Sequence, residues 1–194
     1  LCDLGSQYRL IRCGESAAIS RGDLPMNADA AAITFDDGDL SMYMIAYPLL
    51  KAAGIKATFF IVPSLVGQTC YMTWAQIREM AACEGPDGEK LFEFGSHTMS
   101  HVSLAGLSRD RIRQELDASK QTIRENAGIR CCSGPVLSIN CCCMTAARGC
   151  AELSPPAVVK IWCWKCRTPV CCWILTGRRI TAICGSTPGP SLPL

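Results

Sequence analysis

Short apolar runs alternate with longer helical patterns between residues 30 and 130, and this alternation strongly restricts the folds open to the chain. Three largely apolar runs, at 30–35, 56–62 and 91–94, have the composition of strands covered on both faces. A segment with helical spacing follows each run. The order strand, helix, strand, helix, strand, helix predicts an α/β fold whose parallel strands are joined by right-handed crossovers.

Specific residues mark where the first two of these helices begin and end. We predict a helix over 41–53 that ends at Gly54 and accepts Pro48 only in its first turn. The capping box Thr-Trp-Ala-Gln at 73–76 predicts the start of a second helix, which reaches about Ala82.

The third helix is the longest of the predicted elements. Ser108 can cap its start and Gly128 can end it. Three apolar residues share one face of this helix: Ile112, Leu116 and Ile123. The charged residues between 109 and 124, Glu115 among them, are predicted to form a solvated outer face.

The composition of the chain changes abruptly near Arg130. Residues 1–130 carry a net charge of −3 and 4 of the 15 cysteines, whereas residues 131–194 carry +5 and 11 cysteines. We therefore divide the chain into a lead-in (1–29), one α/β domain region (30–130) and a Cys/Pro-rich tail (131–194). Within the lead-in, residues 8–11 can form a short edge strand.

The overall composition argues against two classes of function. A net charge of +2 over 194 residues argues against a dedicated nucleic-acid binder, which normally presents a basic face. No apolar run reaches the roughly 18 to 20 residues that a transmembrane segment needs. Hydrophobic residues make up 49% of the sequence, which excludes bulk disorder.

Three interpretations of the tail are compatible with its cysteines. Cys163 and Cys166, followed by a Cys-Cys pair at 171–172, could supply four thiolates to a zinc knuckle. A disulfide framework is the second interpretation. The third is out-of-frame or disordered sequence, which we favour because acidic residues are almost absent and prolines interrupt every helical or strand pattern.

Polar residues follow the first and third predicted strands directly. Asp36 and Asp37 come after the first strand, and His97 and His101 come after the third. Because chemistry collects at the carboxyl ends of parallel strands, these four residues are expected on one rim. The two histidines are four residues apart, so a helical turn would project them to one side. A carboxylate and neutral imidazoles suit Zn²⁺ or a similar divalent ion. The alternatives are an ordinary Asp-Asp-Gly turn or helix cap and a surface histidine pair.

These residues resemble the motifs of a known family. The sequence Thr-Phe-Asp-Asp-Gly at 34–38 looks like the first motif of the polysaccharide deacetylases (carbohydrate esterase family 4, NodB-homology domain). Ser-His-Thr-Met-Ser-His at 96–101 looks like their second motif, and the stretches at 57–60 and 72–74 are similar as well. The resemblance covers residues 30–130.

The resemblance implies a fold, an activity and a set of site residues. The fold would be a partial distorted (β/α) barrel with an irregular Cys-rich tail. The activity would be metal-dependent removal of N-acetyl groups from a polysaccharide. Asp36 would be the general base, and Asp37, His97 and His101 would bind a divalent metal, with zinc the expected ion. Thr98 would steady the ligand loop through its hydroxyl group.

The sequence departs from the family after Arg130. The family has an aromatic motif that supplies an oxyanion donor there, and later a histidine that acts as general acid, whereas this tail contains no Tyr and no His. We therefore expect an incomplete, impaired enzyme. The alternative is a non-catalytic glycan-binding or metal-binding remnant of the fold. The family acts on extracellular polymers, so an extracytoplasmic or cell-surface location is the corresponding expectation.

Overall fold

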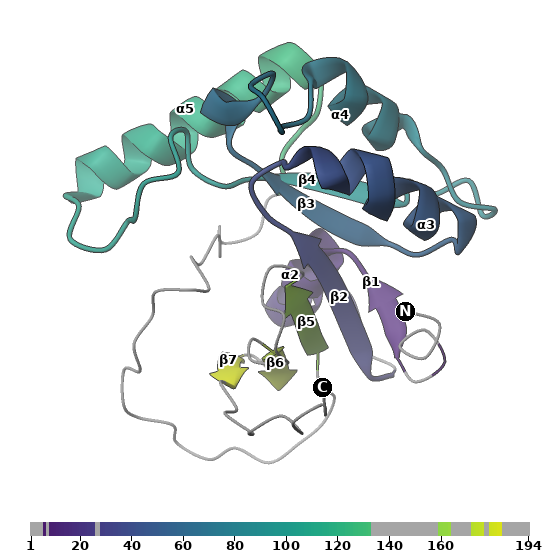
Figure 1. The fold of residues 1–194 in the computed structure, drawn as a ribbon. Coiled ribbons are helices and arrows are strands. Elements are labelled where there is room, and N and C mark those ends of the chain that lie inside the picture. Colours follow the sequence, from purple (N-terminus) through teal and green to yellow (C-terminus); the bar gives the residue numbers. More distant parts are fainter. Residues whose placement is uncertain are drawn as a thin grey trace, which may run out of the picture.

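The computed structural model describes residues 6, 8–25 and 28–132, together with the backbone of three strands in the tail. Figure 1 shows these elements along the chain. The elements before the tail are β1 (Arg9–Ile11), α2 (Cys13–Arg21), β2 (Ala30–Phe35), the π-helical turn η1 (Met42–Ala46), α3 (Tyr47–Ala52), β3 (Ala57–Ile61), the 3₁₀ turn η2 (Pro63–Leu65), α4 (Trp74–Ala82), β4 (Phe92–Ser96) and α5 (Arg109–Ala127). The tail strands are β5 (Val159–Cys163), β6 (Cys172–Thr176) and β7 (Arg179–Ile183).

The strands form one sheet in the order β4-β3-β2-β5-β6-β7, with β1 also paired to β2. The pairings of β2 with β1, β3 and β5, and of β3 with β4, are all parallel. One edge of β2 is shared, because its first half pairs with β1 and its second half with β3, while β5 runs along the other edge. The parallel strands curl into part of a barrel (Figure 1), which confirms the predicted fold class.

The predicted strands lie close to their observed positions. Every residue of β2 and β3 is buried, as expected for strands with both faces covered. The strand predicted at 91–94 is β4, which begins at Phe92 and continues through Ser96. His97 therefore follows the last residue of this strand directly.

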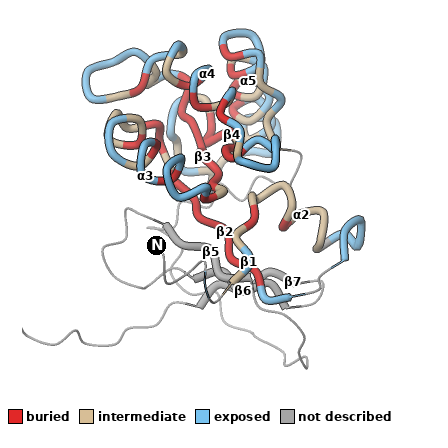
Figure 2. Tube along the Cα trace, turned by 90° about the vertical axis from the view of Figure 1, so that its right-hand side faces the viewer, coloured by how far each residue is buried: buried red, intermediate tan, exposed pale blue. Residues whose placement is uncertain are grey.

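Helices α3, α4 and α5 lie together over one face of the parallel strands (Figure 1). Strands β2 and β3 are buried and β4 largely so, whereas these helices expose their outer surfaces (Figure 2). Aromatic side chains fill the layer between them: the Phe59 ring stacks on Phe35 at 4.9 Å and on Phe94 at 5.6 Å between centroids. Because β3 lies between β2 and β4 and all three run parallel, the carboxyl ends of β2 and β4 lie at the same edge of the sheet.

The segment predicted as one helix over 41–53 is a π-helical turn followed by an α-helix. Pro48 lies in the first turn of α3, as predicted, and Gly54 follows with a φ of +62°. Proline has no amide hydrogen, and its ring would clash with the carbonyl four residues earlier in a regular helix. The π-helical turn over Met42–Ala46 widens the backbone immediately before it and relieves that conflict.

The other two predicted helices are confirmed, with one correction to the outer face of the second. Thr73 caps α4 through the predicted capping box, and Ser108 caps α5. Glu115 of α5 is only 4% exposed, so its predicted place on the solvated face is wrong. Ile112 and Leu116 are half-buried, and Ile123 is fully buried.

The lead-in contains more structure than its sequence indicates. The predicted edge strand is β1, but helix α2 was not predicted. Its N-cap is Arg12, whose side chain pairs with Glu15 in place of the usual Ser, Thr or Asp cap. The N-terminus of α2 contacts the sheet, where the Gly14 amide donates to the Glu93 carboxylate at 2.8 Å.

The tail is described only at residues 131–132 and along the backbone of β5 to β7, which pair antiparallel with one another. The candidate zinc knuckle, the disulfide framework and the out-of-frame interpretation concern side chains and segments outside the described residues, and they stay predictions. Among the described residues, no helix has the length and apolar character that crossing a bilayer requires.

Candidate metal centre

Asp37 is held in a tight turn at the carboxyl end of β2. It has a φ of +77° and the following Gly38 has +88°, in the left-handed region where Asp is tolerated and Gly is free of strain. Two backbone hydrogen bonds hold this turn to other segments of the protein. The Gly38 carbonyl accepts from the Met72 amide at 2.9 Å, and the Asp37 carbonyl accepts from the Val62 amide at 3.4 Å. Asp37 is 4% exposed, so a charged side chain is buried here.

The two histidines occupy the loop that leaves β4. His97 is 3% exposed, and its amide donates to the Ile61 carbonyl at the end of β3 at 2.9 Å. His101 is more open, with 43% of its side chain exposed. The helical turn expected to bring them together does not form here, so that expectation is wrong. The loop is irregular, with Thr98 at a φ of +66° and His101 at +59°.

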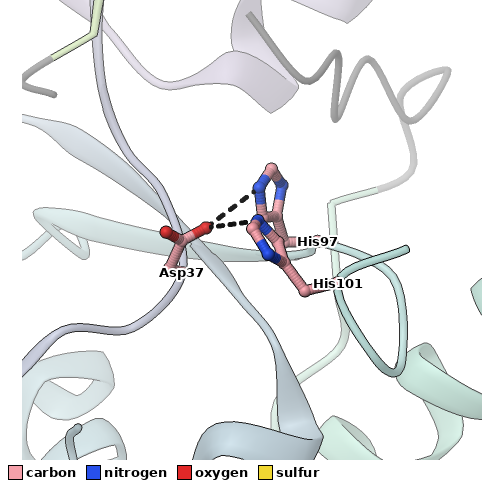
Figure 3. Close-up of side chains that lie close together, drawn as sticks. All are labelled: Asp37, His97 and His101. Carbon is pink, nitrogen blue, oxygen red and sulfur yellow. Dashed lines mark ion pairs between the residues drawn. The ribbon is translucent and has the colours of Figure 1, made fainter. Parts of the chain in front are cut away.

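Both imidazoles point at the same carboxylate oxygen (Figure 3). Nε2 of His97 and Nε2 of His101 each lie 3.1 Å from Oδ1 of Asp37. The ring centroids of the histidines are 5.2 Å apart. One ligand atom from each residue lies within 4.8 Å of the other two, so the three residues could together hold a metal ion.

The donor set fits a divalent transition metal. Burial lowers the pKa of His97, and burial together with the neighbouring His97 lowers the pKa of His101. Neutral imidazoles keep the lone pair that a metal bond uses. Zinc bonds of about 2.0–2.1 Å at tetrahedral angles put ligand atoms about 3.3 Å apart. The two separations of 3.1 Å from Asp37 are close to that value.

Asp36 lies on the same rim but outside the three-residue group. It is half-buried, and its charge acts to raise the pKa of both histidines, against the effect of burial. Thus the four residues expected on one rim are together there, and three of them converge on one point. In the described residues, Asp37, His97 and His101 form the only group of this kind.

The hydroxyl of Thr98 does not play the role expected of it. Thr98 is 3% exposed, and its Oγ1 has no hydrogen-bond partner among the described residues. The loop is instead held by Glu115 of α5, which accepts from the Met99 and Ser100 amides. Sequence reasoning missed Glu115, although its helical spacing to the buried Ile123 could have indicated it.

Comparison with known proteins places these features in one family. Residues 23–136 match the protein family described as Polysaccharide deacetylase. YxkH of Bacillus subtilis (strain 168) is 32% identical over 114 residues, which are 59% of this chain and 38% of that protein. The peptidoglycan-N-acetylglucosamine deacetylase of Bacillus cereus is 32% identical over 105 residues, which are 54% of this chain and 34% of that protein. The chain thus spans little more than a third of the length of these relatives.

A solved structure supports the same assignment of the fold. The Streptococcus pyogenes deacetylase PplD in complex with acetate aligns with a TM-score of 0.55 and 27% identity. The alignment covers 66% of this chain and 54% of that protein. The curled parallel sheet with its outer helices is therefore shared with a deacetylase of known structure.

Proposed function

Because this chain belongs to the polysaccharide deacetylase family, we propose that it is built to remove N-acetyl groups from an N-acetylglucosamine polymer with the help of a divalent metal. The observation that carries this proposal is the convergence of two imidazole nitrogens on one Asp37 oxygen, 3.1 Å from each, beside the second carboxylate Asp36. The relative named for peptidoglycan N-acetylglucosamine supports the substrate class. Peptidoglycan is a cell-wall polymer, and we propose an extracytoplasmic site of action on that basis.

We propose that Asp37, His97 and His101 hold the metal, and that it is zinc, because one carboxylate and two neutral imidazoles are common zinc ligands. A bound divalent ion supplies Lewis-acid polarisation of an amide carbonyl and lowers the pKa of a bound water toward about 7. The chain's own contribution is to present these three ligands already oriented, so that little rearrangement is needed on binding.

Asp36 is the proposed general base. It is half-buried at the rim, so its carboxylate can be reached from outside while it stays next to the buried Asp37. A carboxylate in this place can accept the proton of the water that attacks the acetyl carbonyl carbon. The C–N bond then breaks, and the departing sugar amine needs a proton of its own.

The chain offers no third histidine for that last proton transfer, since both of its histidines are in the candidate metal centre. A positioned general acid is worth typically about 10²–10⁴ in rate. We therefore expect turnover slower by about that factor than that of a deacetylase with such an acid. A non-catalytic remnant that binds metal or glycan is the second candidate function, and the same count of histidines favours it.

Acetate release tests the proposal directly. The full chain, loaded with Zn²⁺, is incubated with an N-acetylglucosamine oligomer, and acetate is measured before and after treatment with a chelator. We expect slow, chelator-sensitive release that Asp36→Asn abolishes without loss of metal binding. Metal or glycan binding with no acetate above the Asp36→Asn background would establish the remnant instead. Release that a chelator leaves unchanged would refute the metal dependence.

A further inference from the structure

Glu115 is a buried carboxylate on helix α5 that the proposed reaction does not use. Only 4% of the residue is exposed, although it lies on a helix whose other acidic residues face solvent. Its one ion-pair partner among the described residues is Arg111, whose Nη2 is 3.3 Å from Oε1 and whose side chain is half exposed. Burying a carboxylate costs free energy unless hydrogen bonds satisfy it. The groups that donate hydrogen bonds to Glu115 therefore indicate its role.

Among the described residues, the hydrogen bonds of the Glu115 carboxylate are with the loop that carries the two histidines. Oε2 of Glu115 accepts hydrogen bonds from the amides of Met99 and Ser100, both at 3.1 Å. The Ser100 hydroxyl lies 3.0 Å from Oε1 and 3.1 Å from Oε2. These two residues are the stretch of chain directly before His101.

The conformation of this loop requires such support. Thr98 and His101 both have positive φ, a region that non-glycine residues adopt only when surrounding contacts impose it. The same face of α5 also fixes the loop where it leaves β4, because Ser119 lies 2.7 Å from the hydroxyl of Ser96, the residue before His97. Helix α5 thus fastens the chain immediately before each histidine.

We propose that Glu115 is a positioning residue for the candidate metal centre. By holding the Met99 and Ser100 amides, it keeps the loop in the conformation in which both imidazoles face Asp37. This inference rests on the proposed metal-dependent function, since it assigns Glu115 to the same site. Glu115 reaches this site through the Met99 and Ser100 amides and the Ser100 hydroxyl, so it acts through the loop that carries the two histidines.

Zinc affinity measured on the full chain tests this proposal. Competition with a chromophoric chelator gives the affinity of the wild type, Glu115→Ala, Glu115→Gln and Asp117→Ala, the last being an exposed acid on the same helix. Cysteine thiolates also bind zinc, so a His101→Ala variant supplies the background to be subtracted. We expect Glu115→Ala to weaken binding at the site about 10-fold or more, as loss of supporting contacts around metal ligands typically does.

The other variants separate positioning from simple loss of charge or of folding. Glu115→Gln keeps an oxygen that can accept from both amides, so it should retain most of the affinity. Asp117→Ala should bind as the wild type does. If Glu115→Ala does not fold by circular dichroism, Glu115→Asp withdraws the carboxylate from the amides while keeping its charge, and it should bind more weakly than Glu115→Gln.

Several results would overturn the proposal. One is a zinc affinity of Glu115→Ala equal to that of the wild type, and another is an equal loss of affinity in Glu115→Ala and Glu115→Gln. A Glu115→Asp variant that binds zinc as tightly as Glu115→Gln would also contradict it. So would a wild type that binds no zinc above the His101→Ala background. Zinc binding that follows the expected order without any acetate release supports the role of Glu115 and refutes only the proposed deacetylation.

Discussion

Replacing Ser119 by Ala tests whether one buried hydrogen bond ties helix α5 to the loop that carries His97 and His101. The hydroxyl oxygens of Ser119 and Ser96 are 2.7 Å apart, and the two residues are 0% and 2% exposed. Ser96 is the last residue of β4 and directly precedes His97. Ser119→Ala therefore leaves the Ser96 hydroxyl buried without the partner that the structure gives it.

The expected cost follows from that burial. A buried hydroxyl left without a partner costs about 1–3 kcal/mol. Alanine at position 119 favours the helix by about 0.5 kcal/mol relative to serine, which offsets a part of the loss. We expect the free energy of unfolding to fall by about 1–2 kcal/mol, or roughly 2–4 °C of melting temperature for each kcal/mol in a chain of this size.

A double-mutant cycle in urea, followed by circular dichroism at 222 nm, measures the pairing itself. Ser96→Ala and Ser119→Ala should each destabilise the protein. The double variant should lose little more than either single variant, because neither hydroxyl is then left alone. Arg113→Ala, at an exposed site of α5, controls for helix propensity. Losses that simply add in the double variant would refute the hydrogen bond as the cause.

Three further predictions concern the core, an interior acid and the thiols. Phe59→Ala should lower the free energy of unfolding by about 3–5 kcal/mol, because the Phe59 ring is fully buried in the aromatic stack. A loss below about 1.5 kcal/mol in urea unfolding would contradict this. Burial raises the pKa of Glu93 above its usual 4.5. Just above that pH the folded state therefore binds more protons than the unfolded state, so the ionisation of Glu93 lowers the free energy of unfolding as pH rises. Glu93→Gln should therefore stabilise the protein more at pH 7 than at pH 4, and equal effects in thermal melts at both pH values would show the shift to be absent. Burial raises the pKa of Cys13 and of Cys132 to about 12. Iodoacetamide at pH 8 should therefore modify the exposed Cys70 before it modifies either of these two thiols. Peptide mass spectrometry can establish the order, and labelling of Cys13 before Cys70 would contradict this assignment.

The local elements of the fold could be predicted because their signals lie among sequence neighbours. The buried runs of β2 and β3, the capping box of α4 and the Ser108 cap of α5 each depend on contacts within a few residues. Helix α2 was missed because it starts at an Arg–Glu pair and not at a standard capping residue. The widened turn before Pro48 was also missed, since the chain can satisfy proline in more than one way.

The candidate site divides in the same manner. The sequence alone indicated Asp36, Asp37, His97 and His101 as candidate site residues, because both the residue types and the ends of the strands can be recognised from neighbouring residues. The convergence of the ligands depends on tertiary contacts. Hydrogen bonds to Ile61 and to Glu115 hold the left-handed residues of the loop in place, and these bonds join residues 15 to 36 positions apart in the chain. Short-range patterns fix which residues reach the rim, whereas backbone strain in the loop persists only where the packed sheet and helix α5 enforce it.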